Sequence, residues 1–457
     1  MRATTRWGLR IGRGAICGAV LAGICLVWSL SSDPVGAADR SARKFQADRF
    51  KRVFHSNRED ARLKLLGEIQ QTYAGDPAVP GALWNAIQHD LDVRRSSPSL
   101  LQAVTLHGTL PDDAVVEQQQ QLLSVKNRDV AMTAALGLAD RQAVSTLPHL
   151  IKLADAPDYR TSYPFRNVVV SSVGSFRDPA SVDFLVNALD KSQGQLRYVA
   201  AERLSQLTGQ NFGGVSEDWN QWWGANRESF RFAPVDRTAR QSEFAPTAIP
   251  DVARRNEPGV ARKDGMPEVA PKNEMPWPEE PPRFFGDPIY ARRFVFVIDR
   301  SRSMESSVDG VTRLEDAQKE LESAIKKLPS DAWFDVIAYE SNVLLWQPKL
   351  VPATPQNKIE ALHFSRRLFP TNKTACYDAL IAALGVDPDL EMILFLSDGE
   401  PTAGTIVEPQ AILADLLQRN HLRRVAIDVI GIDARAGTEQ FLKDLAQQNF
   451  GTYRQIR

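Results

Sequence analysis

The chain has 457 residues, of which 43% are hydrophobic and 24% are charged. These values are typical of a globular protein with two or three domains. Lys and Arg number 55 against 56 for Asp and Glu, which gives a formal net charge of −1. With no basic stripe, this balance argues against a protein that binds nucleic acid or an anionic membrane surface.

The N-terminus has the layout of a secretory signal peptide. Its first fourteen residues hold four arginines and no acid, an apolar run follows over 15–30, and Val35 and Ala37 are small. The pattern predicts a signal peptide over 1–37, cleaved after Ala37, and export to a periplasm, a cell envelope or the cell exterior. The alternative is an uncleaved membrane anchor, which would be the protein's only contact with a membrane.

Cleavage would remove Cys17 and Cys25 and leave Cys376 as the one thiol of the chain. A single cysteine forms no internal disulfide, so the fold must be stable through packing. No histidine stands at a spacing that would make Cys376 a nucleophile, and we expect it to be a small buried side chain.

Residues 38–227 have the apolar spacing of helices throughout. Near the start, Ser56 and Glu59 stand three apart and predict a capping box. At the end, EDWNQWWGANRESF places Trp219, Trp222 and Trp223 on one helical face. We expect this helix to cover the end of the helical core rather than to form an aromatic-lined binding site.

A repeat runs through the second half of this helical block. Segments that begin at Arg128 and Arg166 each have an Asp twelve residues later and a Val four residues after that, and a third copy begins at Arg197. Such offsets fall in or near the range of helix-pair solenoids. The segments resemble HEAT-like repeats, which implies an α-helical solenoid over 38–227 that acts as a scaffold for protein contacts.

Residues 228–290 are expected to be a proline-rich linker. Eleven of the 28 prolines fall between Pro234 and Pro288. Because proline lacks the backbone donor and favours extended backbone, this stretch predicts an extended or disordered tether. Its last part, PEEPPRFFGDPIY, is aromatic and is expected to pack on the domain that begins at residue 291.

Strands alternate with amphipathic helices over 291–457. Strands are expected at 293–299, 333–340, 342–348, 391–398, 423–432 and 451–456, and helices at 314–328, 354–368, 377–384, 410–422 and 438–449, the first of them capped by Thr312 and Glu315. Such alternation predicts a doubly wound, Rossmann-like α/β domain with a mostly parallel sheet. A tight Ser-Asn turn after 333–340 requires an antiparallel edge strand.

Oxygen-bearing side chains follow two of these strands. Asp299, Ser301 and Ser303 end the first strand at every second position, Asp398 ends the fourth, and Thr374 precedes a helix. In doubly wound sheets these strand ends flank the ligand crevice. Two carboxylates and three hydroxyls suit a hard divalent cation better than zinc or copper, and they leave one coordination position free.

Together these residues resemble the von Willebrand factor type A (VWA) domain and its metal-ion-dependent adhesion site. The resemblance covers 291–457 and rests on Asp299-Arg-Ser301-Arg-Ser303, Thr374 and Ser397-Asp398-Gly399. It implies that the serines, and at times the threonine, contact the metal directly while both aspartates act largely through water. It also implies Mg²⁺, with Mn²⁺ and Ca²⁺ as alternatives, and a partner protein whose carboxylate completes the coordination.

Three charged residues border the predicted site. Arg302 and Lys373 stand where this family often has glycine, and both are expected to point away from the metal and to attract an acidic partner. Glu400 follows Asp398 and is a further candidate partner contact.

The leading hypothesis is an exported adhesion or assembly protein, not an enzyme, that binds its partner through a divalent cation. The alternative is a metal-independent structural scaffold in a cell-envelope complex. A metal-dependent hydrolase has less support, because no His or Glu base accompanies the oxygen cluster at a recognisable spacing.

Overall fold

The computed structural model describes residues 45–232, 272, 275–371 and 373–456. The predicted signal peptide over 1–37 lies outside this range, as does most of the predicted linker over 228–290. Among the described helices, none is both long and apolar enough to cross a lipid bilayer.

The first described block is helical, as predicted. Helices α2, α4, α6, α9 and α11 form a series in which each packs against the next, and the remaining helices flank them. The helices are α1 (Ala47–Phe54), α2 (Glu59–Glu68), α3 (Val79–Asp92), α4 (Pro98–Thr109), α5 (Ala114–Leu122), α6 (Arg128–Asp140), α7 (Leu147–Lys152), α8 (Pro157–Thr161), α9 (Tyr163–Val173), α10 (Pro179–Lys191), α11 (Gly194–Thr208) and α12 (Ser216–Asn226).

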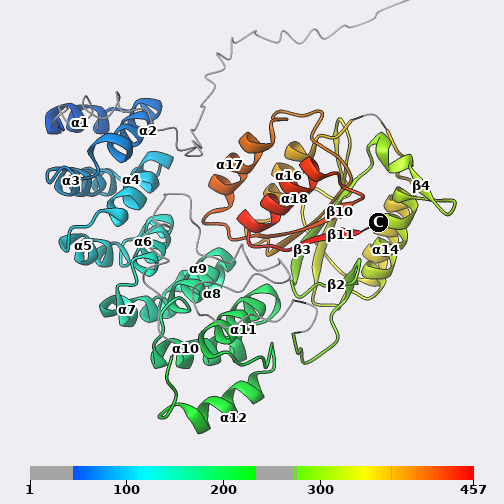
Figure 1. Ribbon diagram of the computed structural model, residues 1–457, viewed down its shortest axis with the longest axis horizontal. Coiled ribbons are helices and arrows are strands. Elements are labelled where there is room, and N and C mark those ends of the chain that lie inside the picture. The colour runs from blue at the N-terminus through cyan, green and yellow to red at the C-terminus, as the bar shows by residue number, and fades with distance from the viewer. Residues whose placement is uncertain (1–44, 233–271, 273–274, 372, 457) are drawn as a thin grey trace, which may run out of the picture. The chain divides into compact units, whose positions relative to one another are not determined.

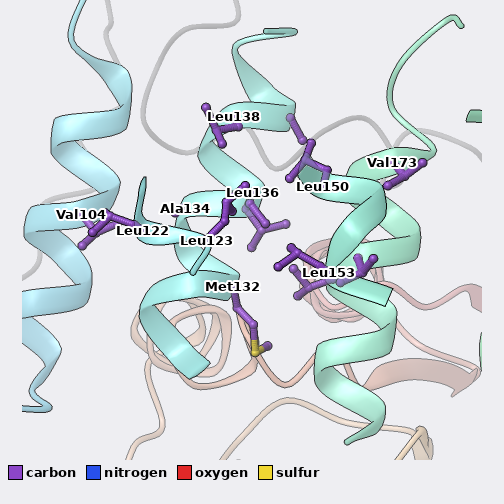
Figure 2. Close-up of a cluster of buried hydrophobic side chains, with 14 of the residues drawn as sticks. Val104, Leu122, Leu123, Met132, Ala134, Leu136, Leu138, Leu150, Leu153 and Val173 are labelled. Carbon is purple, nitrogen blue, oxygen red and sulfur yellow. The ribbon is translucent and has the colours of Figure 1, made fainter. Parts of the chain in front are cut away.

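Aliphatic side chains from successive helices fill the space between them. Figure 2 shows Val104 of α4, Leu122 of α5, Leu138 of α6 and Leu150 of α7 directed into one shared cluster. All four side chains are at most 1% exposed. Helices α4 to α7 therefore bury apolar side chains in one shared core.

Two sequence expectations for this block have different outcomes. The capping box at Ser56 is wrong, because α2 has Arg58 as its N-cap and no side-chain capping bond. Glu59 instead accepts hydrogen bonds from the backbone N–H and the hydroxyl of Ser99, at 2.6 and 2.9 Å. The expectation for the last helix is confirmed, since Trp219 and Trp223 of α12 are buried.

The second block is a mixed α/β domain around a seven-stranded sheet in the order β11-β10-β9-β3-β6-β7, with β8 also paired to β6. Neighbouring strands are parallel except β7 and β8, which run antiparallel to β6 as the predicted hairpin requires. The strands of the block are β1 (Arg283–Phe284), β2 (Asp287–Pro288), β3 (Arg293–Asp299), β4 (Ser307–Val308), β5 (Val311–Thr312), β6 (Trp333–Tyr339), β7 (Val343–Leu345), β8 (Val351–Pro352), β9 (Met392–Ser397), β10 (Ala426–Ile432) and β11 (Tyr453–Ile456).

Helices cover both faces of this sheet (Figure 1), with α16, α17 and α18 on one side and α14 on the other. The central strand β3 serves both layers: Phe294 and Phe296 join the cluster with α14, whereas Val295 and Val297 join the cluster with α16–α18. A strand buried on both faces explains its unbroken apolar sequence. The helices are α14 (Arg313–Lys326), α15 (Pro355–Ser365), α16 (Cys376–Gly385), α17 (Pro409–Asn420) and α18 (Ala436–Gln448).

The core of this domain begins before residue 291. The short hairpin β1–β2 contributes Phe284, which is fully buried and contacts Phe296 with ring centroids 5.2 Å apart. Ile289 belongs to the same cluster. The aromatic end of the predicted linker therefore packs on the sheet domain, as its composition indicated.

Backbone groups of the helical block bind acidic side chains of the α/β block. The N–H of Tyr163 donates to Asp389 at 2.8 Å, and the N–H of Gln195 donates to Glu391 at 3.1 Å. Glu391 also accepts the N–H of Arg292 at 2.8 Å. Burial raises the pKa of Glu391, so these donors offset part of the cost of burying its charge.

The carboxyl of Asp335 is a buried acid inside β6. One oxygen accepts the N–H of Val336 and of Gln347, and the other has no hydrogen-bond partner among the described residues. Burial raises its pKa to about 7, although the two backbone hydrogen bonds oppose this shift. Between about pH 4 and pH 7, the folded protein therefore retains a proton on Asp335. In the unfolded chain, where aspartate has a pKa of about 3.9, this proton has already been released.

Asp335→Asn is expected to flatten the dependence of stability on pH. In the wild type, the free energy of unfolding should fall by up to about 4 kcal/mol as pH rises from about 4 to 7 and then level off, because folding must take up a proton. Asparagine cannot lose this proton, so its gain over the wild type should grow across that window. Urea unfolding between pH 5 and pH 8 measures the difference, and parallel curves for the two proteins would contradict the assignment.

Candidate metal centre

Three loops at one end of the sheet carry the predicted site. Strands β3 and β9 are parallel neighbours, with Ile298 opposite Leu396, so the turns after them leave the same edge of the sheet. The third loop contains Thr374 and is joined to the first by a bridge between Ser301 and Thr371. The first and fourth strands of the domain are therefore neighbours, as the predicted crevice between them requires.

Asp299 is fully buried at the end of β3. Its carboxylate accepts hydrogen bonds from the N–H of Ser301 at 2.8 Å, the hydroxyl of Ser397 at 2.9 Å and the hydroxyl of Tyr339 at 3.1 Å. Burial, with a smaller contribution from the nearby carboxylate of Asp398, raises the pKa of Asp299 to about 6. Three donors from three different strand ends thus hold one acid in place.

The two serines and Asp398 form a continuous hydrogen-bonded set. The hydroxyls of Ser301 and Ser303 are 3.0 Å apart, and that of Ser303 donates to Asp398 at 2.7 Å. The alternation of side chains at every second position ends at Ser301, because a 3₁₀ turn, η6, spans Arg302–Glu305. The serines still converge because Ser301 is extended and the following turn folds Ser303 back over it.

Thr374 lies beside this set. A Cβ atom placed on Gly399 would be 3.9 Å from both the Ser303 and the Thr374 hydroxyl oxygens, so the two hydroxyls flank the same glycine. The backbone of Thr374 is held by Thr402, whose hydroxyl accepts its N–H at 2.9 Å and whose N–H donates to its carbonyl at 3.0 Å. The five predicted ligands therefore lie on adjoining turns.

Arg313 is part of this site although the sequence did not indicate it. Its guanidinium donates to Asp398 at 2.8 Å and to Asp433, just after β10, also at 2.8 Å. The side chain of Asp398 is fully buried, so this ion pair is shielded from water on the acidic side. Only the position of Arg313, directly after the capping residue Thr312, distinguishes it in the sequence.

The surroundings of the site are charged and contain an exposed aromatic. Arg302, Lys373 and Glu400 are all exposed. Phe369, in the loop leading to Thr374, is 64% exposed, the largest value among the exposed large hydrophobic residues described. The guanidinium of Arg300 lies over its ring at 5.7 Å and binds its carbonyl at 3.2 Å.

The donor set fits a hard divalent cation. Two carboxylates and three hydroxyls, all oxygen donors, lie on adjoining loops, and the charge of the two acids would balance such an ion. Within the described residues there is no group of three or more His, Cys, Asp or Glu side chains that could hold a metal. The candidate centre does not require one, since three of its five donor side chains are hydroxyls.

A family model confirms the class of this domain. Residues 292–455 match the model described as von Willebrand factor type A domain. These residues form a VWA domain. VWA domains mediate protein interactions and adhesion.

Curated relatives match over the same kind of segment. Inter-alpha-trypsin inhibitor heavy chain H2 of Homo sapiens is 24% identical over 184 residues, which cover 37% of this chain and 18% of that protein. Heavy chain H1 of Mesocricetus auratus is 33% identical over 125 residues, which cover 25% of this chain and 13% of that protein. The chain therefore matches less than a fifth of the length of either relative.

Solved structures match the chain with low overall scores. A von Willebrand factor type A protein from Catenulispora acidiphila is 24% identical and covers 37% of this chain and 40% of its own, with a TM-score of 0.32. Proximal thread matrix protein 1 from the mussel byssus is 16% identical and covers 36% of this chain and 43% of its own, with a TM-score of 0.28. The latter structure is described as having a zinc-occupied metal-ion-dependent adhesion site motif.

Tyr339→Phe is expected to weaken Mn²⁺ binding and to lower the free energy of unfolding by about 1 kcal/mol, because it removes a hydroxyl donor from the buried Asp299. Tyr377→Phe is the matched control, since that hydroxyl binds Asp415 away from the site. Calorimetric titration with Mn²⁺ and urea unfolding measure the two effects. Equal Mn²⁺ affinity in both variants would show that Tyr339 does not position the acid.

Proposed function

We propose that this protein binds a partner protein through a divalent cation held by Asp299, Ser301, Ser303, Thr374 and Asp398. The observation that carries the proposal is the hydrogen-bonded set from Ser301 through Ser303 to Asp398, with Thr374 beside it. A bound cation supplies a positive centre with a coordination position open to a carboxylate. Mg²⁺ is the proposed ion, with Mn²⁺ and Ca²⁺ as alternatives.

The hydroxyl and carboxylate residues of the proposed site have different roles. Ser301, Ser303 and Thr374 present hydroxyl oxygens to the ion, as the resemblance implies. Asp299 and Asp398 supply negative charge and act on the ion largely through water, and Asp398 also accepts the Ser303 hydroxyl directly. Because Asp299 is held by three donors, the geometry of the set is already formed before any partner arrives.

Residues around the centre would select the partner. The exposed cations Arg302 and Lys373 would attract an acidic segment, and Glu400 would pair with a basic or hydrogen-bonding group next to it. Phe369 offers an exposed aromatic surface whose backbone is held by Arg300. We infer that the partner presents an acidic residue with an apolar neighbour.

The helical block would act as a second contact surface. Successive helices stack in sequence order, which favours a HEAT-like solenoid scaffold over 38–227. With the predicted signal peptide, the proposed role is that of an exported adhesion or assembly protein without catalytic activity. The stacked helices are equally compatible with the second candidate, a metal-independent scaffold in a cell-envelope complex.

Partner capture is expected to depend on the cation. From cell extracts, the immobilised wild type should retain at least one protein in Mg²⁺ that is released by EDTA, and Asp299→Asn should not retain it. Asp335→Asn is the control, because it changes a buried strand acid of the same sheet that has no hydrogen bond to the site residues. Identical capture by all three proteins in Mg²⁺ and in EDTA would leave only the metal-independent scaffold.

Phe369→Ser is expected to weaken retention of the same protein at least several-fold without changing Mn²⁺ affinity, because interface aromatics carry a large share of binding energy. Ile359→Ser is the matched control, since Ile359 is 51% exposed on α15. Equal retention by both variants would exclude Phe369 from the partner surface.

A further inference from the structure

Arg313 places a fixed positive charge on an acid that the proposed cation would use. Its guanidinium spans Asp398 and Asp433, at 2.8 Å to each. The Arg313 side chain is 20% exposed, whereas the side chains of Asp398 and Asp433 are 0% and 33% exposed. One end of the guanidinium thus lies on the buried acid of the candidate centre and the other on an acid that water reaches.

The local sequence holds the backbone of Arg313 in position. It is the first residue of α14, whose start is fixed by a reciprocal capping box between Thr312 and Glu315. The preceding hairpin turns at Asp309 and Gly310, with φ of 53° and 80°, a backbone conformation that glycine adopts without cost. The N–H of Arg313 also donates to Ser306 at 3.0 Å.

The guanidinium and a divalent cation are alternative counter-ions for one carboxylate. Asp398 is buried next to a second acid, Asp299, so its charge needs compensation in any state of the protein. Arg313 supplies that compensation. A divalent ion near Asp398 would be repelled by the guanidinium, and the repulsion falls if the arginine shifts onto Asp433.

We propose that Arg313 is an internal counter-ion that lowers the cation affinity of this site, and that Asp433 receives its guanidinium when a divalent ion binds. The inference rests on the proposed function, because it concerns the same metal centre. In this proposal, Arg313 and Asp433 are not ligands of the ion, but they control how tightly it is bound. It also predicts opposite effects from changing the two residues.

Arg313→Gln removes the competing charge and is expected to tighten Mn²⁺ binding by about tenfold. Asp433→Asn leaves the guanidinium with Asp398 as its one acidic partner and is expected to weaken Mn²⁺ binding. Arg366→Gln is the matched control, because Arg366 pairs with Glu322 on the surface and its side chain is 57% exposed. Titration calorimetry of the full chain with Mn²⁺ gives the three affinities relative to the wild type.

Thermal unfolding without metal provides a second measurement. Arg313→Gln leaves Asp398 without its counter-ion, so its Tm in EDTA is expected to fall, and Mn²⁺ is expected to raise that Tm more than it raises the wild-type value. If both changes merely loosened the loops, each variant would bind Mn²⁺ more weakly than the wild type. Weaker or unchanged binding by Arg313→Gln therefore overturns the proposal.

The outcomes separate this inference from the proposed function. If Arg313→Gln binds Mn²⁺ while the wild type binds none, the counter-ion role is supported and cation-dependent partner binding by the wild type is overturned. If the wild type and Arg313→Gln bind Mn²⁺ equally, the counter-ion role fails while the proposed function stands. If neither protein binds Mn²⁺, both proposals fail.

Discussion

The buried carboxylate of Asp299 is the constraint on which the α/β domain depends. A charge without water is costly unless several donors reach it. Here the donors come from the turn after β3, from Tyr339 at the end of β6 and from Ser397 at the end of β9. Because those three strands are parallel neighbours, a slip in their register would strip the acid of its partners. The pairing of these three strands therefore determines both the order of the sheet and the position of the candidate centre.

Local signals made much of the fold predictable. The alternation over 291–457, the hairpin after β6 and the capping box of α14 depend on residues close in sequence, and each is found in the structure. The box expected at Ser56 failed because Glu59 instead binds Ser99, forty residues away. A sequence pattern that spans only a few residues cannot show that a distant side chain competes for the same hydrogen bonds.

The residues of the candidate centre also differ in whether the sequence alone could predict them. Its five oxygen donors were predictable because each lies at a strand end or a helix start, and in a parallel sheet those positions converge. Tyr339 and Arg313 were not, because their roles arise from the side chains that face them across the sheet edge. In the sequence, Arg313 differs from the other arginines of the chain only in its position directly after the capping residue Thr312. Its partners, Asp398 and Asp433, follow strands that come much later.

The position of Arg313 in the first turn of a capped helix has a kinetic consequence. Its backbone is held by α14, so the guanidinium can change partners only by rotation about side-chain bonds. Such rotations take roughly picoseconds to nanoseconds in exposed side chains, but the Arg313 side chain is only 20% exposed and is held in two ion pairs, so each change of partner is slower. Loading and release of an ion would then be limited by the breaking of these side-chain ion pairs rather than by the opening of a hinge or loop.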